Sequence, residues 1–227
     1  MSPGAAAAVD APAVAARVAA VRARLAELAP GRSVRIVAVT KGFGDDAVEA
    51  AVAAGVTAIG ENYGQELVAK AARGAGGDVV RWHYIGAVQR NKVAQLAPFV
   101  AVWESVDRIA AAEAIARHSP GATALIEVNL VGDPDRTGCA WDAVPGLVEA
   151  ARHAGLTVIG LMGVGPAAAP DSRLFARLAG LAGALGLPEL SMGMSADYEL
   201  AVVEGATIVR LGTALFGPRP PTREVRR

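Results

Sequence analysis

A lysine directly follows a strongly apolar run near the start of the chain. The run is Arg35-Ile36-Val37-Ala38-Val39, and Thr40-Lys41-Gly42 comes next. A buried parallel strand has this pattern, and a charge at its end reaches solvent, pairs with a carboxylate or takes part in chemistry. A solvent-exposed lysine is the simpler interpretation. Because a lysine amine can also form a Schiff base with a carbonyl compound, Lys41 is the first candidate functional residue.

Two later segments have the composition of phosphate-binding loops. The segment Ser191-Met192-Gly193-Met194-Ser195 precedes a predicted helix, and Gly212-Thr213 follows an apolar run. Glycine permits close backbone approach, and the free N–H groups at a helix start suit a phosphate. Each segment alone is also compatible with an ordinary helix cap or strand end. Together with Lys41 they predict a site for a phosphorylated carbonyl compound, and pyridoxal phosphate and a sugar phosphate both remain possible.

Eight short apolar segments alternate with helical segments and must position these groups. This alternation predicts an α/β fold, namely a single (β/α)8 TIM-type barrel with an added N-terminal helix, and a doubly wound open sheet is the alternative. We expect a disordered tail over residues 1–10, one barrel domain over residues 11–217 and a C-terminal tail over residues 218–227. The predicted strands are residues 35–41, 56–59, 82–85, 100–103, 122–128, 157–161, 190–192 and 207–211, and the predicted helices are residues 11–28, 45–54, 65–73, 88–96, 107–117, 141–154, 172–185 and 197–203.

Polar residues and glycines follow most of the predicted strands, at the end of a barrel where active sites lie. These strand ends are Lys41, Glu61-Asn62, Gly86, Glu104-Ser105, Asn129, Met162-Gly163, residues 193–195 and Arg210-Leu211-Gly212-Thr213. Two roles stay open at this point. Glu61 either steers Lys41 or caps the next helix. A hydrogen-bonded structural role is favoured for His83 over that of a catalytic base.

Composition excludes several classes of function. The 227 residues are 53% hydrophobic with a mean hydropathy of +0.36, and 22 basic residues balance 22 acidic ones. This balance does not indicate binding to nucleic acid or to an anionic membrane. Cys139 is the only cysteine and is predicted to be a passive thiol, and the three histidines lack metal-ligand spacing. No segment has the pattern of a signal peptide or a membrane span, so we expect a cytoplasmic protein without a metal.

Several motifs carry a resemblance that spans nearly the whole chain. They are Ala38-Val39-Thr40-Lys41, residues 60–66, residues 82–92, Gly160-Leu161-Met162, residues 190–195 and residues 209–217. With these motifs the chain resembles the pyridoxal phosphate homeostasis protein family, whose barrel is similar to the N-terminal domain of alanine racemase. This resemblance implies pyridoxal 5′-phosphate as cofactor, Lys41 as its Schiff-base lysine and Asn62 near the cofactor. It also implies that Ser195, Gly212 and Thr213 bind the phosphate and that Arg210 faces the pyridine nitrogen.

Three functions are compatible with these residues: a protein that holds and hands on pyridoxal phosphate, an amino-acid racemase-like enzyme, and a Schiff-base sugar-phosphate aldolase. The resemblance favours the first two. Racemases similar to this barrel have a second, β-rich domain that supplies a catalytic tyrosine, and only ten residues follow Gly217 here. We therefore expect a non-catalytic pyridoxal phosphate-binding protein without catalytic residues. We also expect it to be a monomer whose partners are transiently bound apo-enzymes that depend on this cofactor.

Overall fold

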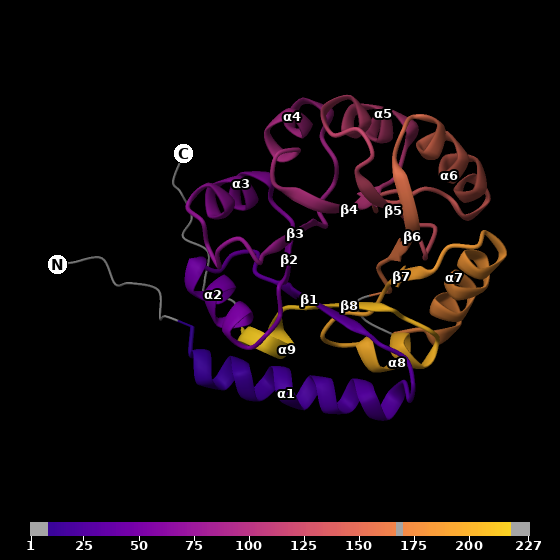
Figure 1. The fold of residues 1–227 in the computed structure, drawn as a ribbon. Helices are drawn as coiled ribbons and strands as arrows, with labels where there is room; N and C mark the ends of the chain where they lie inside the picture. The colour runs from indigo at the N-terminus through magenta and orange to yellow at the C-terminus, as the bar shows by residue number, and fades with distance from the viewer. Residues whose placement is uncertain (1–8, 167–169, 219–227) are drawn as a thin grey trace.

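The computed structural model is a closed ring of eight strands surrounded by helices (Figure 1). It describes residues 9–166 and 170–218. Neighbouring strands pair in parallel in chain order, and β8 pairs with β1 to close the barrel. The predicted (β/α)8 barrel is thus confirmed, and the open-sheet alternative is wrong. The strands are β1 (Arg35–Val39), β2 (Ala58–Glu61), β3 (Arg81–Tyr84), β4 (Val100–Val106), β5 (Thr123–Val128), β6 (Thr157–Gly163), β7 (Glu189–Ser191) and β8 (Ile208–Leu211).

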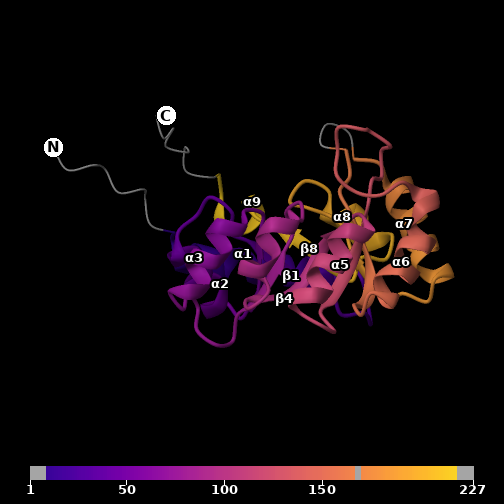
Figure 2. The same cartoon turned by 90° about the horizontal axis from the view of Figure 1, so that it is seen from above.

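Helices connect the strands and form the outer layer (Figures 1 and 2). Parallel strands in one sheet require such crossover connections. The helices are α1 (Ala11–Leu28), α2 (Asp45–Ala53), α3 (Gly64–Ala72), α4 (Val93–Leu96), α5 (Ile109–His118), α6 (Val144–His153), α7 (Ser172–Ala184), α8 (Tyr198–Val203) and α9 (Thr213–Phe216), with short 3-10 helices η1 (Arg90–Lys92) and η2 (Trp141–Ala143).

The added helix α1 has the residue range that its sequence pattern predicts. Val14, Val18, Val21 and Leu25 recur on one face and are buried. The helix lies outside the barrel and contacts α2, α8 and α9. The Arg24 guanidinium binds the Glu199 carboxylate of α8 with an N–O distance of 2.6 Å. Helix α1 therefore packs over the side of the barrel where the last βα unit meets the first.

The core has two parts. The larger part lies between the strands and the helices, and the smaller one lies inside the barrel around Val102, Leu125 and Met162. Barrel interiors are usually filled by bulky branched side chains. Here, buried polar residues share the barrel with the small apolar cluster, and they include His83, Glu104, Glu127 and Arg210. Such residues must be hydrogen-bonded to be tolerated, and the site described below accounts for most of them.

Several predicted boundaries need correction. Glu104 and Ser105 lie within β4 and Glu61 lies within β2, so these three residues do not follow their strands as predicted, whereas Arg210 lies within β8, inside the predicted strand of residues 207–211. All four are buried. The sequence pattern also missed α9. Residues 1–8 of the predicted N-terminal tail and residues 219–227 of the C-terminal one lie outside the described residues, whereas Asp10 accepts a hydrogen bond from the Ala13 N–H at the start of α1.

The described part of the chain contains no helix with the length and apolar character that crossing a membrane requires.

Candidate functional site

The strand register brings the loop that carries Lys41 beside the loop that follows β8. In the β1–β8 pair, Ala38 is opposite Leu211. Lys41 follows Ala38 by three residues, and Gly212 follows Leu211 directly. Both therefore leave the barrel at the same edge, where the carboxyl ends of the strands meet. Lys41 itself is half-buried.

A hydrogen bond joins the two loops predicted to bind phosphate. The hydroxyl of Ser195, in the loop between β7 and α8, accepts the N–H of Ala214 in α9 at 3.1 Å. Ala214 directly follows Thr213, so the structure brings Ser195, Gly212 and Thr213 together as predicted. The first of these loops requires a glycine at Gly193. Its φ is 91°, and a Cβ at this position would lie 2.8 Å from the Tyr198 Cα.

Asn62 lies at the same level of the barrel as Lys41. Val39 of β1 is opposite Gly60 of β2, and each candidate residue is two positions further along its strand. The backbone at Asn62 packs against Gly86 so closely that a Cβ on this glycine would be 2.0 Å from the Asn62 carbonyl oxygen. The half-buried Asn62 also lines a cavity of about 400 Å³ together with Tyr63 and Lys92.

Buried bonds on both sides of Lys41 fix its loop. The Thr40 hydroxyl donates to Glu61 Oε1 at 2.6 Å, and the Lys70 ammonium binds both the Thr40 carbonyl oxygen at 2.9 Å and Glu61 Oε1 at 2.6 Å. On the other side, the Gly42 N–H donates to Glu66 Oε2 at 2.9 Å. Lys70 and Glu66 come from one helix, α3, so this helix holds the residues before and after Lys41 in place.

The contacts of Glu61 decide one of the questions that the sequence left open. The N-cap position of α3, Tyr63, makes no side-chain capping bond, and the hydrogen bonds of Glu61 go to Thr40 and Lys70. The capping alternative is therefore wrong, and Glu61 acts on the residue before Lys41. Burial raises the pKa of the Glu61 carboxyl, while Lys70 and Thr40 oppose this increase. Its second oxygen, Oε2, has no hydrogen-bond partner among the described residues.

A chain of buried hydrogen bonds crosses the barrel interior, and we call it the buried polar chain. The His83 Nδ1 atom lies 2.5 Å from Glu104 Oε1, and Glu104 Oε2 accepts the Ser191 hydroxyl at 2.5 Å. The Ser191 hydroxyl in turn accepts an N–H from Arg210 at 2.7 Å. Burial tends to raise the pKa of Glu104, but its contacts with His83, Arg210 and Ser191 outweigh burial and lower it. His83 is thus hydrogen-bonded inside the barrel, in agreement with the favoured interpretation.

Among the described residues, the hydrogen bonds of the Arg210 guanidinium use three of its five N–H groups. Its two terminal nitrogens donate to Ser191 and to the Gly163 carbonyl oxygen, at 2.7 and 2.9 Å. The Nε–H group has no hydrogen-bond partner among the described residues. Burial lowers the pKa of Arg210, and Glu104, Glu127 and Asp197 oppose this effect. A guanidinium remains protonated in proteins, so Arg210 can only donate.

Other candidate residues have no partner set that suggests chemistry. Burial raises the pKa of the Cys139 thiol to about 11, so the thiol remains protonated near neutrality and is a poor nucleophile. The Asn129 amide binds the backbone of its own loop at Gly132 and Asp133. No group of three or more histidine, cysteine, aspartate or glutamate side chains within the described ranges is placed to hold a metal ion.

Sequence reasoning did not identify Lys70, Glu66 or the link between Glu104 and Ser191. Glu66 and Lys70 are four residues apart, a spacing that places two side chains on one face of a helix. That signal is present in the sequence, but it does not reveal that the pair faces the loop of Lys41. Glu104 interrupts the apolar run of residues 100–106. A charged residue at this position predicts the end of a strand. The partners that keep Glu104 inside lie on β3 and β7, far away in sequence, so the local pattern does not reveal them.

Comparisons with known proteins agree with this architecture. The family model of the alanine racemase N-terminal domain matches residues 9–220. A "Pyridoxal phosphate homeostasis protein" of Pseudomonas aeruginosa is 41% identical over 214 residues, which cover 88% of this chain and 92% of that protein. A protein of the same name from Deinococcus radiodurans is 41% identical over 202 residues, covering 85% of this chain and 95% of the relative.

Solved structures show the same fold. PipY of Synechococcus elongatus is 33% identical to this chain and has been solved without and with PLP bound, with TM-scores of 0.80 and 0.79. The alignments cover 90% of this chain and 100% of PipY. Alanine racemase of Corynebacterium glutamicum has a TM-score of 0.69 at 19% identity, with coverage of 96% of this chain and 64% of that one, and so supports the fold alone. By the extent of the family match and the identity to its curated relatives, the chain belongs to the pyridoxal phosphate homeostasis protein family, within the alanine racemase N-terminal domain group.

Proposed function

We propose that this chain binds pyridoxal 5′-phosphate at the carboxyl end of the barrel, as a Schiff base on Lys41, and holds it for transfer without turning over a substrate. The observation that carries the proposal is the register of β1, β2 and β8. This register brings the segments that carry Lys41, Asn62 and Gly212 to the same end of the barrel. The name of the curated relatives and the PLP-bound structure of PipY support the same cofactor.

Each proposed contact is assigned to a named group of this chain. When bound, the cofactor supplies an aldehyde carbon, with which a lysine amine condenses to a Schiff base and one water molecule. Lys41 supplies the amine, and the loops joined by Ser195 and Ala214 receive the phosphate. Arg210 directs its Nε–H at the pyridine nitrogen. Asn62 lies at the level of Lys41 and contacts the ring from the β2 side.

The identity of Arg210 supports a holding role. Pyridoxal chemistry draws electrons into the ring most strongly when an acidic partner protonates the ring nitrogen. A guanidinium donates a hydrogen bond and cannot accept one, so it favours an unprotonated nitrogen. Hydrogen bonds to Ser191 and to the Gly163 carbonyl oxygen hold the Arg210 guanidinium in place. This arrangement weakens carbanion stabilisation and leaves cofactor binding unaffected.

The lysine content of the chain makes a sharp test possible. The sequence contains three lysines, Lys41, Lys70 and Lys92. Lys70 is buried in its ion pair with Glu61, whereas Lys92 lies in the cavity that Asn62 lines. We expect Lys41→Ala to abolish the near-visible absorbance of the Schiff base and to retain part of the cofactor affinity through the phosphate loops. Lys92→Ala is the control and should keep the absorbance. If Lys92→Ala lost the absorbance and Lys41→Ala kept it, the Schiff base would lie on Lys92 and the assignment to Lys41 would be wrong.

A second experiment tests the absence of catalysis. The protein loaded with pyridoxal phosphate is incubated with L-alanine in deuterated water, and the α-proton and the optical rotation are followed. We expect negligible exchange and racemisation. Turnover on the order of 1 s⁻¹ or more would favour the racemase-like alternative. We further propose that the cofactor passes to apo-enzymes that depend on it and that the protein acts as a monomer in the cytoplasm.

A further inference from the structure

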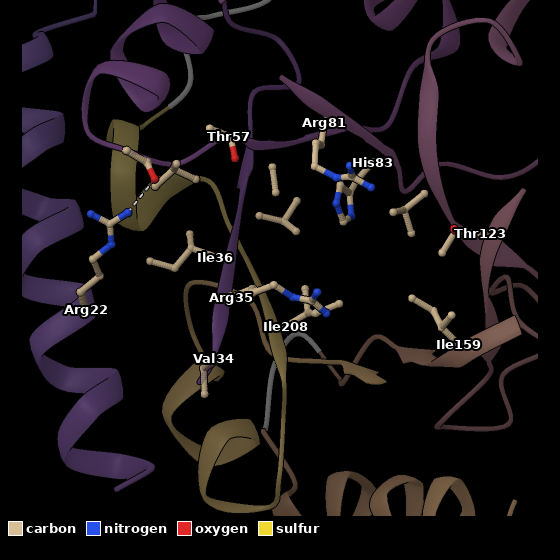
Figure 3. A pocket seen from close by; sticks show the side chains of 15 residues that line it. Arg22, Val34, Arg35, Ile36, Thr57, Arg81, His83, Thr123, Ile159 and Ile208 are labelled. Carbon is tan, nitrogen blue, oxygen red and sulfur yellow. Dashed lines mark hydrogen bonds between the residues drawn. The ribbon is translucent and has the colours of Figure 1, made fainter. Parts of the chain in front are cut away.

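A second pocket lies at the opposite end of the barrel from the proposed cofactor site, and we call it the amino-end pocket. It has a volume of about 400 Å³. The first residues of five strands line it, which places it at the mouth where the strands begin (Figure 3). Those five residues are Arg35, Ala58, Arg81, Thr123 and Ile208. None of the six residues predicted to bind the cofactor is among the described residues that line it.

The amino-end pocket has an excess of positive charge. Arg22, Arg35 and Arg81 line it, and no aspartate or glutamate belongs to its described lining. Arg22 donates to the backbone carbonyls at the end of α2, and Arg35 pairs with Glu189 at 2.5 Å. Arg81 is exposed, and its guanidinium makes no hydrogen bond or ion pair within the described ranges, although its backbone N–H donates to the Thr57 carbonyl oxygen at 2.8 Å. Arg35 begins β1 and Arg81 begins β3, so the two arginines border the pocket from strands that only β2 separates (Figure 3). One guanidinium of this pocket therefore lacks a countercharge.

His83 adds a polar group from the floor of the pocket. The residue is 7% exposed, and its ring lines the pocket. Its Nδ1 atom must carry a hydrogen, because it faces a Glu104 oxygen at 2.5 Å and Glu104 is an acceptor held ionised by its neighbours. Its Nε2 atom has no hydrogen-bond partner among the described residues. Nε2 is therefore the ring nitrogen of His83 that can contact a ligand in the pocket. Thr57 and Thr123 add hydroxyl groups to the same lining.

The remaining wall of the pocket is apolar, so a ligand that fills the pocket needs an apolar part. This wall consists of Val34, Ile36, Val102 and Ile159. A volume of about 400 Å³ is within the usual range for small-molecule pockets, about 300–1,000 Å³, and exceeds what a bare inorganic ion needs. A guanidinium fork matches the geometry of carboxylate and phosphate oxygens.

We propose that the amino-end pocket binds a small organic oxyanion, with a phosphate or carboxylate group held by Arg81, Arg35 and His83 and an apolar body against the branched side chains. This site is separate from the proposed cofactor site and does not depend on it. The two ends are connected, however, because His83 is also the first member of the buried polar chain that ends at Arg210.

The test is a titration followed by amide NMR on the protein loaded with pyridoxal phosphate, with phenyl phosphate and benzoate as anionic probes and benzyl alcohol as the neutral probe. Signals of Thr57, Ala58 and Thr123 report the amino end, whereas signals of Ser195 and Gly212 report the carboxyl end. We expect saturable shifts at the amino end with at least one of the anionic probes and none with benzyl alcohol. Shifts confined to the carboxyl end would overturn the proposal without bearing against cofactor binding.

Two variants separate a built site from general attraction by positive charge. Arg81→Gln removes a charge from the pocket without breaking a bond among the described residues. Arg152→Gln removes a charge from the exposed surface of α6, outside the pocket. We expect Arg81→Gln to weaken binding by about tenfold, equivalent to about 1.4 kcal/mol, and Arg152→Gln to leave it within about twofold. Equal weakening by both variants, or equal binding of the neutral probe, would overturn the proposal.

Discussion

The buried ion pair under the Lys41 loop offers the most demanding test of how this site is held. Lys70 is 3% exposed and Glu61 is fully buried, and their charged atoms are 2.6 Å apart. In Lys70→Met, the Glu61 carboxylate loses its countercharge and Thr40 loses the donor to its carbonyl. Removal of one partner from a buried ion pair costs about 3–5 kcal/mol. We expect a loss of this size in the free energy of unfolding near pH 8, measured by urea denaturation with circular dichroism.

The pH dependence of this loss identifies its cause. Burial already raises the pKa of Glu61 above its ordinary value of 4.5, and the loss of Lys70 would raise it further. When folding raises the pKa of an acid, the acid lowers the stability of the fold only at pH values where it is ionised in the unfolded chain. For Glu61 this stability cost therefore disappears below about pH 4.5 and grows above it. The loss in Lys70→Met should therefore be much smaller near pH 4 than near pH 8.

Two further variants complete this prediction. Glu61→Gln combined with Lys70→Met removes both charges and should recover much of the stability lost in Lys70→Met. Arg73→Met breaks the exposed pair with Asp45 on the outer surface of the same helix end and should have a far smaller effect. An equal loss at both pH values, or a double variant as unstable as Lys70→Met, would refute the role assigned to the ion pair.

Three other predictions concern the rest of the site. Glu104→Gln should lower the free energy of unfolding by about 1–3 kcal/mol near neutral pH, because one partner in the buried polar chain loses its acceptor. Since folding lowers the pKa of Glu104, this difference should shrink as the pH falls below about 4.5. A difference that does not depend on pH in urea denaturation would argue against an ionised Glu104. Gly86→Ala should displace the Asn62 backbone, because its Cβ would lie 2.0 Å from the Asn62 carbonyl oxygen, and it should therefore lower cofactor affinity in equilibrium dialysis. The control is Gly146→Ala on α6, where the added Cβ meets no atom within 4 Å, and equal affinity in both variants would contradict this reasoning. Ser195→Ala should weaken cofactor retention with a stability cost of about 1 kcal/mol, and unchanged retention would leave the serine a structural bond to Ala214.

The sequence predicted the architecture because local patterns encode it strongly. The valines and leucine on one face of α1, together with Pro30-Gly31 after it, specify that helix completely. Apolar runs separated by glycines likewise identify eight strands. The placement of Lys41 at a strand end required only the barrel topology. Asn62 and Gly212 were selected by the resemblance, and the register of β1 with β2 and β8 brings their segments to the same end of the barrel as Lys41.

Features that depend on contacts across the barrel could not be predicted. Glu104 interrupts an apolar run, and a charged residue normally indicates a strand end. It remains inside the barrel because Ser191 of β7 donates to it and in turn accepts a hydrogen bond from Arg210 of β8. The role of Lys70 depends on which face of α3 meets β1, and α9 is too short, at four residues, to give a periodic signal.

Reduction of the loaded protein with borohydride tests the central claim most directly. Reduction fixes the cofactor to its lysine, and a modified lysine resists trypsin, so the position of the label is read from peptide masses. A label on Lys41 gives a peptide spanning residues 36–70, whereas a label on Lys92 gives residues 91–108 and one on Lys70 gives residues 42–73. We predict one pyridoxyl group on the peptide of residues 36–70. A label confined to either of the other two peptides would contradict the assignment of Lys41.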